Sequence, residues 1–423
     1  MSELKDTLPA SQEYSRLKSA LSSDDASGDS YSARRRRLWI LRMYYFIWLG
    51  GAGSVSPFLN LFLAHQSLNG VQIGWIIAIG SLTGLFAAPL WTRLSAESRR
   101  PMRLLQVSLL LTGAASVLLS AQTIFLWLAV FFTLRILFSA GQSPLSDALA
   151  LRLTDGTNSG YGSVRVWGSF GWAVIVLATG WLIQQTSLRS GLIEYGFLMV
   201  AAVLLLTQVR LKADPPQSGK GERRQGFLQV GADILHSPLL WGLALMLIII
   251  GVANQGVLQF ENIYLSQLGA SDSLIGVASM ASSLVELGGM LWADRLVRRR
   301  APASILLISL LLYVMLRGLM FLFPSMWLIV LTRAAGGIPF SFYTVALVKY
   351  ISRHTLANQT ATALAIFTVT LPSLINITCT PPVGYLFDLV GAHWLYLMAL
   401  VGYALGALVL WVIKERDINQ EQP

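Results

Sequence analysis

Residues 58–63 read Phe58-Leu59-Asn60-Leu61-Phe62-Leu63, and a near copy, Phe260-Glu261-Asn262-Ile263-Tyr264-Leu265, follows 202 positions later. Two further pairs keep the same shift: Ile73-Gly74 with Ile275-Gly276, and Arg93-Leu94 with Arg295-Leu296. A repeat spread over apolar segments in this way indicates that the chain consists of two similar halves. Phe58 and Asn60 of the first half then occupy positions equivalent to those of Phe260 and Asn262 of the second.

The composition is that of a membrane protein. Of 423 residues, 54% are hydrophobic and 12% charged, whereas soluble domains carry about 25% charged residues. A span needs about 20 mostly apolar residues, and twelve windows qualify: 39–64, 71–94, 104–121, 123–151, 161–185, 192–209, 239–265, 272–294, 303–323, 326–350, 360–387 and 392–413. A bilayer offers no water to unpaired backbone groups, so these windows must be helices. The sequence therefore predicts an all-α polytopic membrane protein with 12 transmembrane helices in two pseudo-symmetric six-helix bundles.

The charged and polar stretches divide this chain into five parts. We predict a disordered cytoplasmic tail at 1–37, an N-terminal bundle at 38–210, a cytoplasmic linker loop at 211–238, a C-terminal bundle at 239–414 and a cytoplasmic tail at 415–423. The first part is polar and rich in serine, which is typical of disorder.

Basic residues set the predicted orientation. They gather at the span ends on one side of the membrane, at Arg34 to Arg37, Arg99, Arg100, Arg103, Lys212, Arg223, Arg224, Arg298 to Arg300, Lys349 and Lys414. The connections on the other side hold only Arg189. By the positive-inside rule both termini are cytoplasmic, in a multi-pass protein of the cell inner (plasma) membrane. The net charge of +10 is thus a topology signal, and we expect no nucleic-acid partner.

Charged side chains inside spans are costly and mark functional sites by default. The sequence places Arg135, Asp147, Arg165, Glu286, Arg317 and Arg333 within spans, and Glu261 near a helix end. Four arginines face two or three acids in this count. An unbalanced arginine is costly unless an anion visits it, which favours an anionic solute.

Asp147 and Arg165 flank a strong turn signal at 155–160. Because the two helices are antiparallel, we expect both charges at similar depth, where they can pair. Trp172 follows Arg165 by two helical turns on nearly the same face. A carboxylate, a guanidinium and an indole together suit a sugar, through charge-assisted hydrogen bonds and ring stacking. A structural ion pair with a packing tryptophan is the equally open alternative.

The stretch that contains these residues has a recognisable pattern. It comprises Phe138-Ser139-Ala140-Gly141, Pro144, Asp147, Tyr161-Gly162-Ser163-Val164-Arg165, Gly168 and Gly171-Trp172. It resembles the lactose permease group of oligosaccharide, nucleoside and phenylpropionate proton symporters in the major facilitator superfamily. The resemblance implies that Asp147, Arg165 and Trp172 bind solute. Asp147 replaces a glutamate and is one methylene shorter.

Other matches to this superfamily are shorter. The phrase Trp292-Ala293-Asp294-Arg295-Leu296 is similar to its loop motif between the second and third helices of a half, which implies a gating role for Asp294 and Arg295. Phe58 also matches the family pattern, and we expect Phe58, Asn60 and Asn262 near a gate and in reach of solute. Ordinary interface packing is the alternative for these three.

The second half departs from the symporter pattern. Arg317 aligns with an arginine that the resemblance connects with proton release, but Ala334 and Gly337 stand on the tenth helix where His and Glu would be expected. We therefore assign proton coupling to Glu286, with Arg317 and Arg333 as candidate partners. A permanent structural pair is the alternative. Arg135 resembles the superfamily's fourth-helix arginine pattern, which is connected with coupling, although a structural role is equally open.

We therefore expect a secondary active transporter that moves a small polar organic solute, such as a sugar or nucleoside, by alternating access and proton symport. The alternatives are an exporter or importer of an anionic or aromatic acid and, in another class, a non-transporting scaffold or receptor. No nucleotide motif or nucleophile elbow is present, so we do not expect an enzyme. We expect a proton gradient to drive transport, without a cofactor. One cysteine and four scattered histidines argue against a metal site. Its partners would be the solute and the lipid bilayer, and the protein would act as a monomer.

Overall fold

A computed structural model describes residues 28–98, 100–154, 160–209 and 227–420 of the chain. Within these residues, 12 helical segments are long and apolar enough to cross a membrane, and they coincide with the twelve predicted windows. The first six spans are α2 (Gly28–Val55) with α3 (Leu59–His65), α4 (Gly70–Glu97), α5 (Pro101–Ser120), α6 (Phe125–Ser139) with α7 (Gln142–Thr154), α8 (Tyr161–Gln185) and α9 (Arg189–Thr207).

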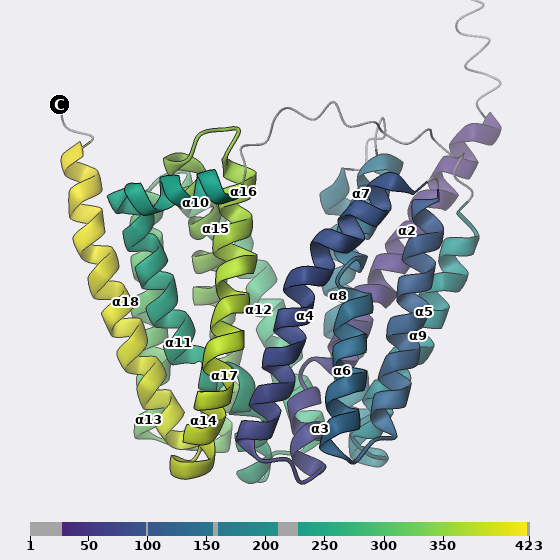
Figure 1. The fold of residues 1–423 in the computed structure, drawn as a ribbon, viewed down its shortest axis with the longest axis horizontal. Helices are drawn as coiled ribbons and strands as arrows, with labels where there is room; N and C mark the ends of the chain where they lie inside the picture. The colour runs from purple at the N-terminus through teal and green to yellow at the C-terminus, as the bar shows by residue number, and fades with distance from the viewer. Residues whose placement is uncertain (1–27, 99, 155–159, 210–226, 421–423) are drawn as a thin grey trace, which may run out of the picture.

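The second six spans repeat this order. They are α11 (Pro238–Gln267), α12 (Asp272–Val297), α13 (Pro302–Leu322), α14 (Met326–Ala335) with α15 (Gly337–His354), α16 (Thr360–Ala365) with the π-helical turn η1 (Ile366–Thr370) and α17 (Leu371–Val390), and α18 (Ala392–Gln420). The predicted all-α arrangement of twelve spans in two six-helix bundles is confirmed (Figure 1).

The predicted boundaries of the tails and the linker need correction. Helix α2 begins at Gly28, so the segment 28–37, predicted as disordered, is helical. The linker contains a short amphipathic helix, α10 (Phe227–His236), which lies across the end of the C-terminal bundle (Figure 1). Helix α18 continues to Gln420, well into the predicted tail. The rest of the predicted N-terminal tail, 1–27, and most of the predicted linker, 211–226, lie outside the described residues.

Several spans are interrupted at glycine or proline. The fourth breaks at Ala140-Gly141 and the tenth at Gly336. The first breaks before Leu59, after Pro57, which we did not anticipate; Pro57 has no backbone N–H to continue the helical hydrogen bonds. In the eleventh, the π-helical turn precedes Pro372, whereas the helix runs through Pro381 without a break.

Glycines bring the first and fifth spans into close contact. A Cβ atom on Gly171 of α8 would lie 2.1 Å from the Phe46 carbonyl oxygen of α2, and one on Gly168 would lie 2.2 Å from Leu49 Cδ1. In a membrane, where helices gain little by leaving lipid, such small residues provide the close van der Waals packing that holds them together. This contact fixes α8 against α2 beside Asp147.

The two bundles lie closest at the end opposite the C-terminus and diverge toward the end that carries it (Figure 1). Two glycine contacts join them there. A Cβ on Gly384 of α17 would lie 2.0 Å from the Gly70 oxygen of α4, and one on Gly276 of α12 would lie 2.8 Å from the Val176 oxygen of α8. We call this end, defined by Gly70, Gly180, Gly276 and Gly384, the closed end.

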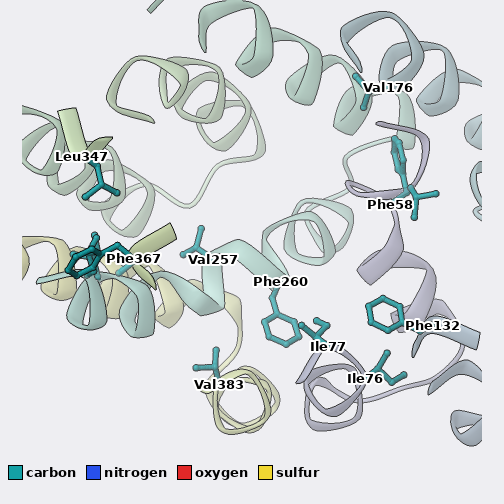
Figure 2. Packing of buried hydrophobic residues seen from close by; sticks show 14 of the residues in the cluster. Phe58, Ile76, Ile77, Phe132, Val176, Val257, Phe260, Leu347, Phe367 and Val383 are labelled. Atoms are coloured by element: carbon teal, nitrogen blue, oxygen red, sulfur yellow. The ribbon is translucent and has the colours of Figure 1, made fainter. Parts of the chain in front are cut away.

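Apolar side chains fill the space between the bundles at the closed end. Figure 2 shows Phe260 of α11 beside Ile77 of α4, and both side chains are buried. The Phe260 ring stacks on Phe387 with centroids 4.5 Å apart. The contact is therefore well packed as well as close.

Many large apolar side chains instead face outward on the helices, for example Phe86, Phe197 and Leu291, each about 70% exposed. On a soluble protein such surfaces would be a liability. Here they form the surface that contacts the lipid bilayer.

Candidate solute and coupling sites

Asp147 lies in the N-terminal bundle and is held by hydroxyl groups from three helices. The Tyr45 hydroxyl of α2 donates to Oδ1 at 2.9 Å, and the Tyr161 hydroxyl of α8 donates to the same atom at 2.8 Å. Ser143, one turn earlier on α7, donates to Oδ2 at 3.3 Å. A carboxylate can accept about four hydrogen bonds, so Asp147 retains acceptor capacity.

The predicted ion pair between Asp147 and Arg165 does not form among the described residues, where neither side chain takes part in an ion pair. Tyr161, one turn before Arg165, contacts the carboxylate instead, and Arg165 is exposed. Trp172 is half-buried and packs against the apolar core. The structure thus brings Asp147 to helix α8 through Tyr161 and leaves Arg165 exposed.

A second set of hydrogen bonds holds helix α7, which carries Asp147, against its neighbours. Trp48 Nε1 donates to Gln142 Oε1 at 3.0 Å, and Gln142 Nε2 donates to Thr112 Oγ1 at 2.8 Å. The Tyr44 hydroxyl meets Ser146 Oγ at 2.6 Å. Our sequence reasoning missed these residues and Tyr45. The available signal was the occurrence of Tyr and Trp inside an apolar span, because their polar atoms need a partner when buried.

Arg135 is buried in the N-terminal bundle at 9% exposure. Its Nε donates to Ser116 Oγ at 3.1 Å, and its guanidinium lies 5.1 Å from the centroid of the Tyr195 ring. These neutral partners come from α5 and α9. They tie three helices of one bundle together, which is the structural alternative that the sequence left open.

A cavity of about 260 Å³ lies in the C-terminal bundle. Its lining includes Glu261, Glu286, Tyr313, Arg317, Arg333 and Phe340, from α11, α12, α13, α14 and α15. Three of these are the predicted coupling residues. The structure therefore brings Glu286, Arg317 and Arg333 together around one space.

The predicted partners of the two arginines need correction. Arg317 Nη1 lies 3.4 Å from Glu261 Oε1, and Arg333 Nη1 lies 3.8 Å from Glu261 Oε2. Glu286, which we expected to pair with them, forms no ion pair in the described part of the chain. Glu261 comes close because it lies near the end of α11, at the level where Arg317 nears the end of α13.

The predicted gate residues Asn60 and Asn262 each bind the opposite bundle at the closed end. Asn60 Nδ2 donates to the side-chain and backbone oxygens of Gln259, both at 2.9 Å. Asn262 Nδ2 donates to the Pro57 carbonyl at 2.6 Å, and Asn262 Oδ1 accepts from Arg333. Phe58 is 2% exposed and belongs to the apolar core. None of these three residues is among those that line the cavity.

Asp294 and Arg295 lie near the other end, on α12. Arg298 Nη2 donates to Asp294 Oδ2 at 2.6 Å within the same helix, and both side chains are well exposed. Arg295 is exposed as well. Among the described contacts, Asp294 therefore does not latch the two bundles in this conformation, in which their backbones diverge at that end (Figure 1).

The sequence count of intramembrane charges overlooked Glu194 on α9. Thr179 Oγ1 of α8 donates to its Oε2 at 2.8 Å. With Glu194 included, Asp147, Glu261 and Glu286 bring the acids to four, equal to the four arginines. The imbalance that favoured an anionic solute thus disappears.

Two membrane-embedded six-helix bundles, sealed against each other at one end and carrying polar sites inside, define a membrane transporter. The sequence model described as "MFS_1 like family" matches residues 38–398, and the chain belongs to this family of the major facilitator superfamily. It is not an enzyme.

Known relatives support the same class. The chain is 28% identical to the maltose permease of Geobacillus stearothermophilus, over 90% of this chain and 95% of that protein. It is 25% identical to the "Probable 3-phenylpropionic acid transporter" of Escherichia coli, over 88% and 96%. The crystal structure of the nucleoside transporter NupG superposes with a TM-score of 0.77 at 14% identity, covering 90% of this chain and 98% of that one.

Proposed function

We propose that this transporter carries small polyhydroxylated solutes, sugars or nucleosides, together with protons. The observation that carries the proposal is the environment of Asp147, an acid inside a span whose described partners are hydroxyl groups and not a cation. A carboxylate that already binds phenol and alcohol hydroxyls is suited to exchange them for the hydroxyls of a sugar.

Arg165 and Trp172 complete this solute site on α8. The exposed guanidinium of Arg165 offers a planar set of donors to solute oxygens, and the Trp172 ring offers a face on which a pyranose or nucleobase can stack. Asn60 and Asn262 would meet solute only when the closed end opens. In this structure Asn60 binds the C-terminal bundle and Asn262 binds the N-terminal bundle.

Proton coupling would lie in the other bundle, at the cavity. Glu286 lines it without a cationic partner among the described ion pairs, so its carboxylate is available to take a proton. Arg317 and Arg333 stand on the same cavity wall. Arg135, buried among neutral groups, would support coupling by holding the helices of the solute-binding bundle in place.

The orientation follows from the basic residues. We place the protein in the inner (plasma) membrane as a monomer, with both termini in the cytoplasm. The closed end then faces outward. The structure then corresponds to the inward-facing state of an importer that works by alternating access.

Transport of an anionic or aromatic acid is the second candidate, favoured by the relative whose printed name includes 3-phenylpropionic acid. The intramembrane acids and arginines are equal in number once Glu194 is counted, so an excess of arginines no longer favours an anionic solute. Its remaining support in the structure is Arg165, an exposed cation beside the solute site.

The test is uptake into proteoliposomes of radiolabelled maltose, uridine and phenylpropionate, with and without an inward proton gradient. We expect gradient-dependent uptake of a hydroxylated solute, abolished in Asp147→Asn and in Arg165→Ala, while Glu194→Gln, an intramembrane acid outside both sites, retains it. Uptake of phenylpropionate alone would replace the sugar proposal by the acid one. Normal uptake in both site variants would refute the site.

A further inference from the structure

The C-terminal bundle contains a continuous polar connection from the cavity to the closed end. It begins at Glu261, which faces Arg317 and Arg333 at 3.4 and 3.8 Å. Arg333 donates to Asn262 Oδ1 through the same Nη1 atom, and Asn262 donates at 2.6 Å to the Pro57 carbonyl of the other bundle. The Asn262 amide is thus bound to the Arg333 guanidinium through its oxygen and to the N-terminal bundle through its nitrogen.

The charges around the cavity are unevenly shared in this conformation. Two guanidiniums face one carboxylate, Glu261, while Glu286 lines the same cavity without an ion pair among the described residues. A charged carboxylate inside a span is costly unless it is paired. The arrangement is thus best satisfied with Glu261 charged and Glu286 carrying a proton.

Arg333 lies on a shorter helix than Arg317, and its Nη2 also donates to Ser279 Oγ of α12, the helix that carries Glu286, at 3.1 Å. Arg333 belongs to the short helix α14, which ends at Ala335 just before the break at Gly336. Arg317 lies within the longer helix α13, and contacts Met320 Sδ at 3.3 Å and the Tyr313 ring at 5.9 Å. A small displacement of α14 relative to α15 would carry the Arg333 guanidinium across the cavity.

We propose that Arg333 exchanges between Glu261 and Glu286, and that this exchange makes or breaks the Asn262–Pro57 contact that holds the closed end. The step deepens the proposed proton coupling and rests on it. When Glu286 releases its proton to water and Glu261 takes one up, Arg333 follows the charge to Glu286. Asn262 then loses its orienting donor, and the two bundles separate at the closed end.

The surroundings of Glu261 are consistent with this exchange. The charged and titratable groups that face it are Arg317 from α13, Arg333 from α14 and the Tyr396 hydroxyl of α18, which donates to Oε1 at 3.4 Å; Tyr264 follows on α11 itself, and Glu286 and Tyr313 line the shared cavity from α12 and α13. After the exchange, Arg317 would remain beside the neutral Glu261. Glu286 would then be the charged partner of Arg333, and Glu261 would be the protonated carboxyl.

The test measures the closed end directly and needs no solute. In a Cys379→Ser background, spin labels at Thr123→Cys and Gln267→Cys report the separation of the bundles by electron–electron double resonance. Both positions are exposed, between α5 and α6 and at the end of α11. We expect Glu261→Gln to shift the populations toward longer separations at least about tenfold, which corresponds to about 1.4 kcal/mol. Glu194→Gln, a neutralised acid bound within its own bundle, is the matched control and should keep the wild-type distribution.

Two further variants keep the test decisive. Asn262→Ala removes the contact with Pro57 without leaving an unpaired charge, and should open the closed end even if Glu261→Gln does not fold. Glu286→Gln deprives Arg333 of its second charged carboxylate, so the double variant Glu261→Gln/Glu286→Gln should lose the opening that Glu261→Gln alone produces.

An unchanged distribution in Asn262→Ala, or in folded Glu261→Gln, overturns the proposal, and so does an equal shift in Glu194→Gln. These distances are independent of which solute is carried and of its binding at Asp147. Failure of the proposed function would appear as uptake without proton dependence while the distances still shift; failure of the exchange would leave proton-coupled uptake with unchanged distances.

Discussion

Asp388 of α17 binds the first turn of α4 in the other bundle, where its Oδ1 accepts from the Gly70 N–H at 2.7 Å and its Oδ2 from the Val71 N–H at 3.2 Å. A carboxylate at a helix N-terminus meets both unpaired N–H groups and the positive end of the helix dipole. The closed end is therefore held by an electrostatic contact between bundles as well as by apolar packing.

Replacing this carboxylate should weaken the closed end. We expect Asp388→Asn to shift the equilibrium toward opening by about 1 kcal/mol, the scale of one charge at a helix N-terminus. Labelling of a cysteine at Ser273 by a membrane-impermeant maleimide would report this as faster modification. Asp294→Asn, at the other end of the molecule, is the control; equal acceleration in both would contradict the assignment.

Glycine at the contact between α12 and α8 should be essential to closure. A Cβ at Gly276 would lie 2.8 Å from the Val176 oxygen, whereas one at Gly288 of the same helix would meet nothing within 4 Å. We expect Gly276→Val to abolish transport and to favour opening at the closed end, because backbone atoms cannot yield to a side chain. Gly288→Val should transport normally. Transport by Gly276→Val would show that the bundles need not approach this closely.

The hydroxyl groups around Asp147 should contribute to stability. Removing a hydrogen bond to a charged group costs about 1.5–3 kcal/mol, so Tyr45→Phe should lower the unfolding temperature measured by tryptophan fluorescence in detergent. The matched control is Tyr385→Phe, since Tyr385 is exposed. An unchanged unfolding temperature in Tyr45→Phe would mean that another group takes over the contact.

Asp294 should matter for turnover and not for the stability of the present conformation. Its ion pair with Arg298 is exposed and lies within one helix, and such pairs contribute about 0–1 kcal/mol. Asp294→Asn should therefore leave the unfolding temperature nearly unchanged while reducing the uptake rate, if Asp294 latches the bundles when the other end closes. An unchanged uptake rate would remove it from the gate.

The helices and their grouping were predictable from local properties. Length and apolarity marked twelve spans, and the repeat at 58–63 and 260–265 marked two halves. Both features can be read directly from the sequence, because a segment of about 20 apolar residues is long enough to span a bilayer as a helix. The break after Pro57 was equally local and was overlooked.

Partners of the buried charges were not predictable in the same way. Equal depth suggested that Asp147 would meet Arg165, but depth leaves open the direction in which each side chain leaves its helix. That direction depends on how α2, α7 and α8 rotate as they pack, which places Tyr45, 102 positions away, on the carboxylate. Likewise Glu261, and not Glu286, faces Arg317 and Arg333.

The amino-acid sequence by itself thus determined how many helices cross the membrane, how they divide and which charges lie inside. Only the tertiary structure decided which charges meet and which end is sealed. The physical reason is that membrane insertion depends on the composition of each segment alone, whereas a contact depends on the rotation and tilt of two helices, which the packing of all twelve determines together.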